Sequence, residues 1–202
     1  GKSVLFNQET ISEVLMKLDV TYKLLDYNLC FLETPLKTRE REYLMNCKKF
    51  SSESKFEIAI NWIDSAISLN PKNGSYYYLR GQNNFELGFL DDALNDFNKS
   101  ISLDSLNYDV YNFKGLTLIK NGNSKEAIIS FKQSIKLNSN RNMAFNNLGE
   151  VFFEEKQYND AISYYNLALQ HGYNAYTFYN LGLAKYFYNQ DYVQVIKDMD
   201  SA

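Results

Sequence analysis

The sequence predicts an all-α protein built as a solenoid, in which helix pairs stack on one another in chain order. The most direct sign is self-similarity along the 202-residue chain with a period of 34 residues. The second is that the chain holds only 2 prolines, which suits long helices because proline removes a backbone donor. The third is apolar residues at helical spacing inside each period. One helix pair cannot bury its apolar face alone, so the repeats are expected to share one continuous core.

Columns of small residues define the repeat. The second half of each unit opens with a small residue, at 34-residue steps: Ala59, Ala93, Ala127, Ala161 and Val195. The first half carries a glycine column whose last step is one residue shorter: Gly81, Gly115, Gly149 and Gly182. Small residues at these places predict helices that cross closely. Large side chains are expected to fill the space beside each crossing: Ile63, Phe97, Phe131, Tyr165 and Met199.

The columns place two helices in each unit. The predicted bounds are 40–52 and 55–69, 74–87 and 90–103, 108–121 and 124–137, 142–155 and 158–171, and 175–188 and 191–202. The units are 40–73, 74–107, 108–141, 142–174 and a partial unit, 175–202. Gly88 and Gly122 fall between the two helices of their units, where positive φ is often needed.

Residues 1–39 do not fit the repeat. Thr10 and Glu13 have the spacing of a capping box. An apolar stripe at helical spacing follows: Ile11, Val14, Leu15, Leu18, Tyr22, Leu25 and Leu29. We expect one amphipathic helix that packs on the first unit as an N-terminal cap. The alternatives are a remnant of a preceding domain or an oligomerisation helix.

The columns resemble the tetratricopeptide repeat family. The clearest unit reads Phe145-Asn-Asn-Leu-Gly-Glu-Val-Phe152, followed by Ala161-Ile-Ser-Tyr-Tyr165 and Ala168. The resemblance covers about residues 40–202 and implies a right-handed superhelical solenoid of antiparallel helix pairs. Arg80 and Lys114 depart from the pattern, because the family usually has leucine there, and Asn46 does so in the first unit.

The resemblance also implies a binding surface. In this family the first helix of each unit lines a concave groove in which peptides usually lie. Carried over by repeat position, the candidate peptide-binding residues are Tyr78, Phe85, Asn112, Leu116, Asn146, Asn147, Glu150, Phe153, Glu154, Tyr176, Tyr179, Asn180 and Leu183. The set is aromatic and acidic, so a basic or hydrophobic partner segment is one interpretation. The other is that the carboxylates form a solvated stripe and the aromatic rings pack against neighbouring helices.

Two specialised grooves of the family can be compared with this one. The clamp that holds chaperone C-termini uses Lys, Asn and Arg at set positions, and neither possible frame of this sequence supplies that set. Another group bonds the peptide backbone with a ladder of asparagines. Asn147 and Asn180 occupy ladder positions here, but Leu79 and Phe113 interrupt the ladder.

Little in the sequence indicates catalysis. The only histidine, His171, falls at the end of a predicted helix, and no His and Cys set has metal-ligand spacing. We therefore predict no catalytic residue, no metal and no cofactor. A net charge of −3 gives no basic face for nucleic acid. No apolar run is long enough to span a membrane. Two cysteines favour a reducing compartment such as the cytoplasm, although one bridge in an exported protein is an alternative.

Three functions fit these observations. The first is a non-enzymatic adaptor or scaffold that binds a partner peptide in its groove. The second is a substrate-targeting or regulatory region of a larger enzyme. The third is a structural subunit that oligomerises through its C-terminal end, because no polar capping helix follows the fifth unit.

Overall fold

The computed structural model describes residues 35–138, 142–172 and 174–200, and the regular structure in these residues is entirely helical. The helices are α2 (Pro35–Ser52), α3 (Phe56–Leu69), α4 (Gly74–Leu87), α5 (Leu90–Leu103), α6 (Tyr108–Lys120), α7 (Ser124–Leu137), α8 (Asn142–Glu154), α9 (Tyr158–Gln170) and α10 (Ala175–Asp200).

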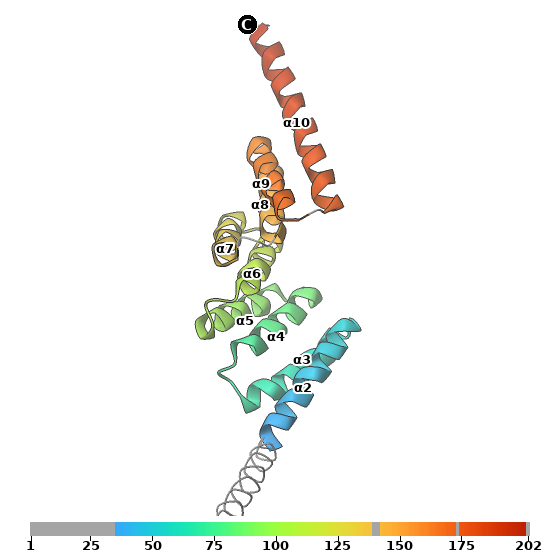
Figure 1. The fold of residues 1–202 in the computed structure, drawn as a ribbon, viewed down its shortest axis with the longest axis vertical. Coiled ribbons are helices and arrows are strands. Elements are labelled where there is room, and N and C mark those ends of the chain that lie inside the picture. The colour runs from blue at the N-terminus through green and yellow to red at the C-terminus, as the bar shows by residue number, and fades with distance from the viewer. Residues whose placement is uncertain (1–34, 139–141, 173, 201–202) are drawn as a thin grey trace, which may run out of the picture.

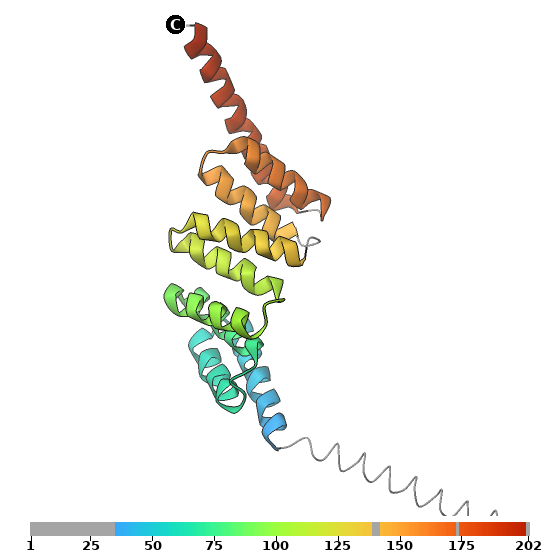
Figure 2. The same ribbon diagram turned by 90° about the vertical axis from the view of Figure 1, so that its left-hand side faces the viewer.

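The helices stack as antiparallel pairs along the long axis of the molecule (Figures 1 and 2). Each second helix packs against the first helix of its own unit, and then against the first helix of the next unit. Contacts also join α4 to α6, α6 to α8, and α8 to α10. The first helices therefore lie side by side along one surface of the stack. The predicted all-α solenoid of helix pairs is confirmed.

The predicted helices agree with the structure except at two places. The first helix begins at Pro35 rather than at residue 40, so residues 35–39 continue into the first unit. The expected turn near residues 189–190 is wrong, because α10 is one unbroken helix. The predicted N-terminal helical cap covers residues 1–39, and its residues 1–34 lie outside the described residues, as do the side chains of Val195 and Met199. The unit boundaries remain a prediction.

The turn inside each of the first four pairs has a recurring backbone geometry that α10 lacks. Four turns have one residue with positive φ, at 34-residue steps: Ser54, Gly88, Gly122 and Lys156. The next position in this series is Gln190. A left-handed conformation is unfavourable for a residue with a side chain, whereas a continuing helix satisfies the backbone at no such cost. Non-glycine residues do make the turn in the first and fourth units, where buried Ala59 and Ala161 pack the second helix.

Asparagine residues begin several of the helices. The side chains of Asn73, Asn107 and Asn174 accept hydrogen bonds from backbone N–H groups two residues later, over 2.9–3.1 Å. Asn123 accepts one from the N–H of Glu126 at 3.3 Å. These bonds satisfy donors that have no partner inside the helix. Part of the chain's asparagine content is therefore explained by helix capping.

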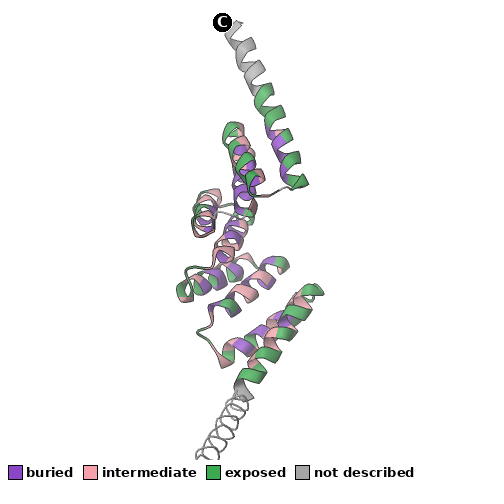
Figure 3. Ribbon diagram, viewed as in Figure 1, coloured by how far each residue is buried: buried purple, intermediate pink, exposed green. Residues whose placement is uncertain are grey.

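The predicted small and large columns form the core. Ala59, Ala93, Ala127 and Ala161 are fully buried. A Cβ on Gly81, Gly115 or Gly149 would lie only 2.5–2.7 Å from an aromatic ring 16 residues later in the chain. Those rings belong to Phe97, Phe131 and Tyr165. Buried residues follow the faces where helices meet (Figure 3). Gly182 differs, because a Cβ there would meet no atom within 4 Å among the described residues.

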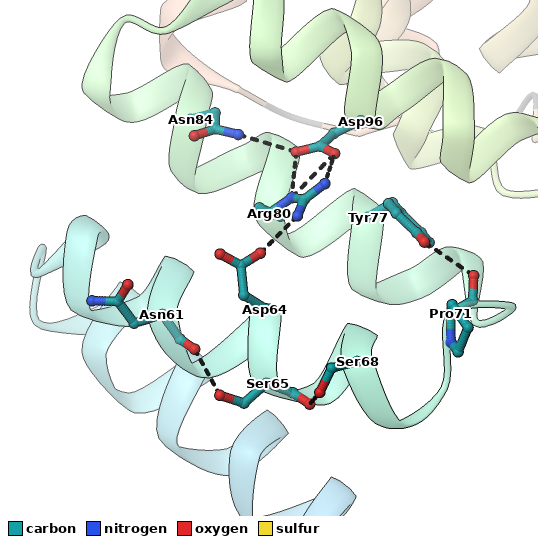
Figure 4. Close-up of polar contacts among 9 residues, drawn as sticks. All are labelled: Asn61, Asp64, Ser65, Ser68, Pro71, Tyr77, Arg80, Asn84 and Asp96. Carbon is teal, nitrogen blue, oxygen red and sulfur yellow. Dashed lines mark hydrogen bonds and ion pairs between the residues drawn. The ribbon is translucent and has the colours of Figure 1, made fainter.

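Arg80, which stands where the family usually has leucine, joins two units (Figure 4). Its guanidinium donates to Asp96 of α5 at 2.6–3.2 Å and to Asp64 of α3 at 2.6 Å. Asp96 also accepts a bond of 3.0 Å from the amide of Asn84. Lys114, at the same position one unit later, donates to Asn98 at 2.8 Å. Polar bridges thus replace leucine packing at these two positions.

Candidate groove between the first helices

The main cavity lies where α6, α8 and α10 face one another, and it has a volume of about 550 Å³. Consecutive turns of α8 supply Asn147, Glu150 and Glu154 to its wall, because residues three and four apart share one helix face. Apolar side chains of α6 and α10 form other parts of the wall. The lining is Leu116, Ile119, Ser124, Phe131, Asn147, Glu150, Val151, Phe153, Glu154, Tyr165, Tyr176, Asn180 and Leu183.

A chain of amide hydrogen bonds runs along the wall of this cavity. The amide of Asn147 donates to Asn112 of α6 at 2.9 Å. Asn146 and Asn180 both donate to Oε1 of Glu150, at 2.8 and 3.3 Å. Asn146 in turn accepts a bond of 3.0 Å from the hydroxyl of Thr177. These bonds tie α6, α8 and α10 together and fix the carboxylate of Glu150 in place.

The cavity is negatively charged. Glu150 and Glu154 belong to its lining, whereas the described residues that line it include no lysine, arginine or histidine. Burial raises the pKa of Tyr165, with further contributions from Glu150, Tyr176 and Glu154. The site therefore offers oxygen acceptors beside apolar and aromatic surface, which suits a ligand that has both a cationic group and an apolar part.

A second cavity, of about 250 Å³, lies nearer the N-terminal end between α2, α3, α4 and α6. Leu79 and Phe113, the residues that interrupt the asparagine ladder, belong to its lining. Lys48 and Glu86 supply one charge of each sign. This half of the surface therefore lacks the surplus of carboxylates found at the main cavity.

The structure brings most of the predicted binding residues together. Eight line the main cavity: Leu116, Asn147, Glu150, Phe153, Glu154, Tyr176, Asn180 and Leu183. Asn146 lines an adjoining hollow that shares Asn147, Glu150 and Tyr176 with it, and Asn112 is buried behind Asn147.

Three predicted residues lie elsewhere. Phe85 is only 8% exposed and packs in a core cluster with Ala93, Phe97 and Val110. Tyr78 packs its ring against Phe97 and Phe113. Tyr179 is 64% exposed on α10 and does not belong to the lining of the main cavity.

The sequence analysis did not identify Tyr165 as a site residue. Its column predicted only core packing, and the residue is indeed 1% exposed. The ring nevertheless reaches past Gly149 and lines the cavity. The sequence feature that could have identified it is the hydroxyl group: this repeat column holds phenylalanine in the two preceding units, at Phe97 and Phe131, and tyrosine here.

The described residues show few other features that suggest chemistry. They contain no group of three or more His, Cys, Asp or Glu residues placed to hold a metal ion. None of their helices is long and apolar enough to cross a membrane. His171 ends α9 and stacks on Phe145 at a ring separation of 5.2 Å, a packing contact at a helix end.

Solved structures share this architecture. One is "Crystal structure of MamA protein", with a TM-score of 0.66 and 21% identity, covering 79% of this chain and 88% of that one. Another is YrrB, described as "a TPR protein with an unusual peptide-binding site", with a TM-score of 0.60, 23% identity, and coverage of 73% and 76%. A third is the first TPR domain of Spaghetti (RPAP3) bound to the HSP90 peptide SRMEEVD, with a TM-score of 0.55, 19% identity, and coverage of 56% and 90%. At these sequence identities the structural similarity shows the fold, which is a helical-repeat solenoid.

Comparison of the sequence with known proteins and protein families identifies the type of repeat. No curated protein matches the chain. A family model described as tetratricopeptide repeat matches residues 78–141 and 114–175, which span the second to fourth units. Residues 78–175 are therefore tetratricopeptide repeats.

Proposed function

We propose that this protein is a non-enzymatic adaptor that binds an extended segment of a partner protein along its first helices, with the main cavity as the anchoring point. The observation that carries the proposal is the cavity itself, of about 550 Å³, with aromatic, apolar and carboxylate side chains on its wall. Interaction sites are characteristically concave and largely apolar, with a few placed polar groups. Tetratricopeptide repeats generally serve as interaction modules, which agrees with an adaptor.

The charge of the cavity favours a particular type of segment. The peptide SRMEEVD bound by the Spaghetti domain is rich in carboxylates. Glu150 and Glu154 would repel such a sequence here, because like charges brought together in a partly desolvated site are unfavourable. We therefore expect a segment that is basic and apolar, and we expect it to bind without an acidic C-terminus.

A capture experiment tests the groove. Wild-type protein and a Glu150→Lys, Tyr176→Ala variant are used as baits, and the captured proteins are quantified by mass spectrometry. The matched control is Glu155→Lys, which makes the same charge reversal at an exposed residue outside the cavity lining. We expect the double variant to lose partners that both wild type and control retain. Equal capture by all three proteins would show that the groove is not the binding site.

A second candidate function is supported by α10. In this helix a Cβ at Gly182 would meet no atom of the described residues within 4 Å, whereas Gly81, Gly115 and Gly149 are each covered by a ring. Phe178 and Tyr186, on the turns before and after Gly182, are 47% and 58% exposed. The helix thus presents a stacking face on which a helix of another copy could pack, as in a structural subunit.

Solution mass tests this second function. Sedimentation equilibrium should show self-association that a Gly182→Leu variant, which fills the open slot, abolishes. A strict monomer at every concentration would contradict it.

For location we propose the cytoplasm, because the chain has only two cysteines and Cys47 is a buried free thiol. Imaging of the tagged protein in its own cell tests that assignment.

A further inference from the structure

The hydroxyl of Tyr165 is the feature of the cavity that core packing does not explain. The residue occupies a packing column in which the two preceding units have Phe97 and Phe131, so the ring alone would suffice there. Tyr165 is 1% exposed, and its hydroxyl has no hydrogen bond to any described residue. Among the described residues, every side-chain oxygen or nitrogen that is fully buried has a hydrogen-bond partner. The hydroxyl of Tyr165 must therefore open into the cavity that the residue lines.

The groups beside this hydroxyl are mainly free acceptors. Two amides hold Oε1 of Glu150, while its Oε2 has no partner among the described residues. The amide nitrogens of Asn147 and Asn180 are donating, so their carbonyl oxygens remain available to a ligand. Glu154 lies one helical turn beyond Glu150 and adds a second carboxylate. A ligand that enters here meets several acceptors and a net negative charge.

We propose that this cavity is a specific pocket for an arginine side chain of the partner segment, received by the Glu150 carboxylate and the Tyr165 hydroxyl. A guanidinium has five donors in one plane and no acceptor, which complements a wall of separate oxygen atoms. Its methylene stem would lie on Leu116 and Leu183, and its plane could stack on the ring of Tyr176. The proposal rests on the proposed groove function and adds the identity of one ligand side chain.

The pocket is also organised before binding. The carboxylate of Glu150 is fixed by Asn146 and Asn180, and Asn146 is itself fixed by Thr177. A group held in place loses little conformational freedom when the ligand arrives, so more of the interaction appears as affinity. An ordinary solvated carboxylate stripe would not have this support from its own helix and from the neighbouring helix α10.

Binding of two synthetic peptide mixtures tests the pocket. Both are fluorescein-labelled nonapeptides with the same degenerate residues at eight positions, and the fifth position is arginine in one and citrulline, its neutral isostere, in the other. Fluorescence anisotropy should show that wild-type protein binds the arginine mixture about tenfold more tightly. Glu150→Gln should abolish that preference, and Tyr165→Phe should reduce it. Glu155→Gln removes the same charge outside the cavity and should retain the preference.

The Tyr165→Phe variant separates recognition from folding. Phenylalanine fills this column in the preceding units, so the variant should unfold at the same temperature as wild type while losing selectivity. Tight binding of both mixtures without selectivity would overturn the pocket and leave the groove function standing. Binding of neither mixture would also overturn the pocket, and the capture experiment would then decide on the groove independently. An arginine preference that survives both Glu150→Gln and Tyr165→Phe would place arginine elsewhere and contradict the proposal.

Discussion

At the scale of single residues, one spacing recurs through the stack. A residue in a first helix meets a second-helix residue 16 positions away, as Gly115 does with Phe131. Arg80 uses the spacing in both directions, to Asp96 and to Asp64. The same geometry therefore serves an apolar crossing on one side of the helix and an ionic bridge on another.

The glycine crossing gives a matched pair of substitutions. Gly115→Ala should destabilise the protein by about 1–3 kcal/mol, because its Cβ would lie 2.5 Å from the Phe131 ring. Gly182→Ala should be neutral or stabilise by up to about 1 kcal/mol, because the slot is open and alanine is the better helix former. Urea unfolding measures both. Equal losses would mean that Gly182 is covered as the other glycines are.

The ionic bridge from Arg80 to Asp96 and Asp64 gives a second matched pair of substitutions. Asp96 is 6% exposed in its side chain and Asp64 is 47% exposed. Asp96→Ala should cost about 3 kcal/mol, because it leaves the half-buried Arg80 guanidinium with only one partner. Asp64→Ala should cost less than about 1 kcal/mol, as exposed ion pairs contribute little. Thermal unfolding of the two variants checks the order, and the reverse order would refute this account of the bridge.

At the scale of helices, the turns decide where each element ends. Four turns share a positive-φ residue at one repeat position, and two of these residues are not glycine. The repeat thus makes turns even where the local sequence disfavours them, provided that the second helix packs well.

These turns predict an easily measured stabilisation. Lys156 has φ of 59°, a conformation that is unfavourable for residues with a side chain. Lys156→Gly should therefore stabilise the protein by about 1 kcal/mol, and Gly122→Ala should destabilise it by a similar amount. Chemical denaturation of both variants is the check. If Lys156→Gly destabilises, the left-handed geometry of that turn is not a source of strain.

The sequence predicted repeat columns better than it predicted the last helix. The eight helices α2 to α9, which form four pairs, were located because buried Ala93, Ala127 and Ala161 impose the same crossing in each unit. The break expected in α10 rested on the repeat register alone. Among the described residues, Gly182 has no ring packed against it as Gly149 does. The contribution of Tyr165 to the cavity was not predicted. Periodicity identifies its ring as a core residue, but does not show that the ring also lines a cavity.

At the scale of the whole molecule, the surface formed by the first helices changes character along the stack. Its N-terminal half is lined by Leu79, Phe113 and balanced charges, and its C-terminal half by two carboxylates and amides. A partner segment lying along the groove would thus meet an apolar region first and an acidic cavity second.

The first unit also gives the molecule a dependence on pH. Hydrogen bonds from Tyr76 and Asn70 lower the pKa of Glu40 from its ordinary value and tie α2 to later residues. A carboxyl whose folded pKa is depressed contributes stability above its unfolded pKa, and that contribution disappears as pH falls through the folded value. Wild type should exceed Glu40→Gln in stability at pH 7, and the difference should shrink below about pH 4.

The exposed Glu42, on the same helix, provides the control for this dependence. Thermal unfolding of wild type, Glu40→Gln and Glu42→Gln across pH 3–7 compares the three. A difference between wild type and Glu40→Gln that stays constant with pH would show that the Glu40 bonds do not act through its charge.

The most direct test of the central claim is site-specific photo-crosslinking from the groove. A benzophenone amino acid replaces Leu183, in the cavity lining, or Ile129, which is 67% exposed on the second helix α7. The account predicts that the Leu183 probe crosslinks to one segment of a captured partner and that the Ile129 probe does not. Crosslinks to the partner from Ile129 but not from Leu183 would contradict it, because the partner would then bind outside the groove.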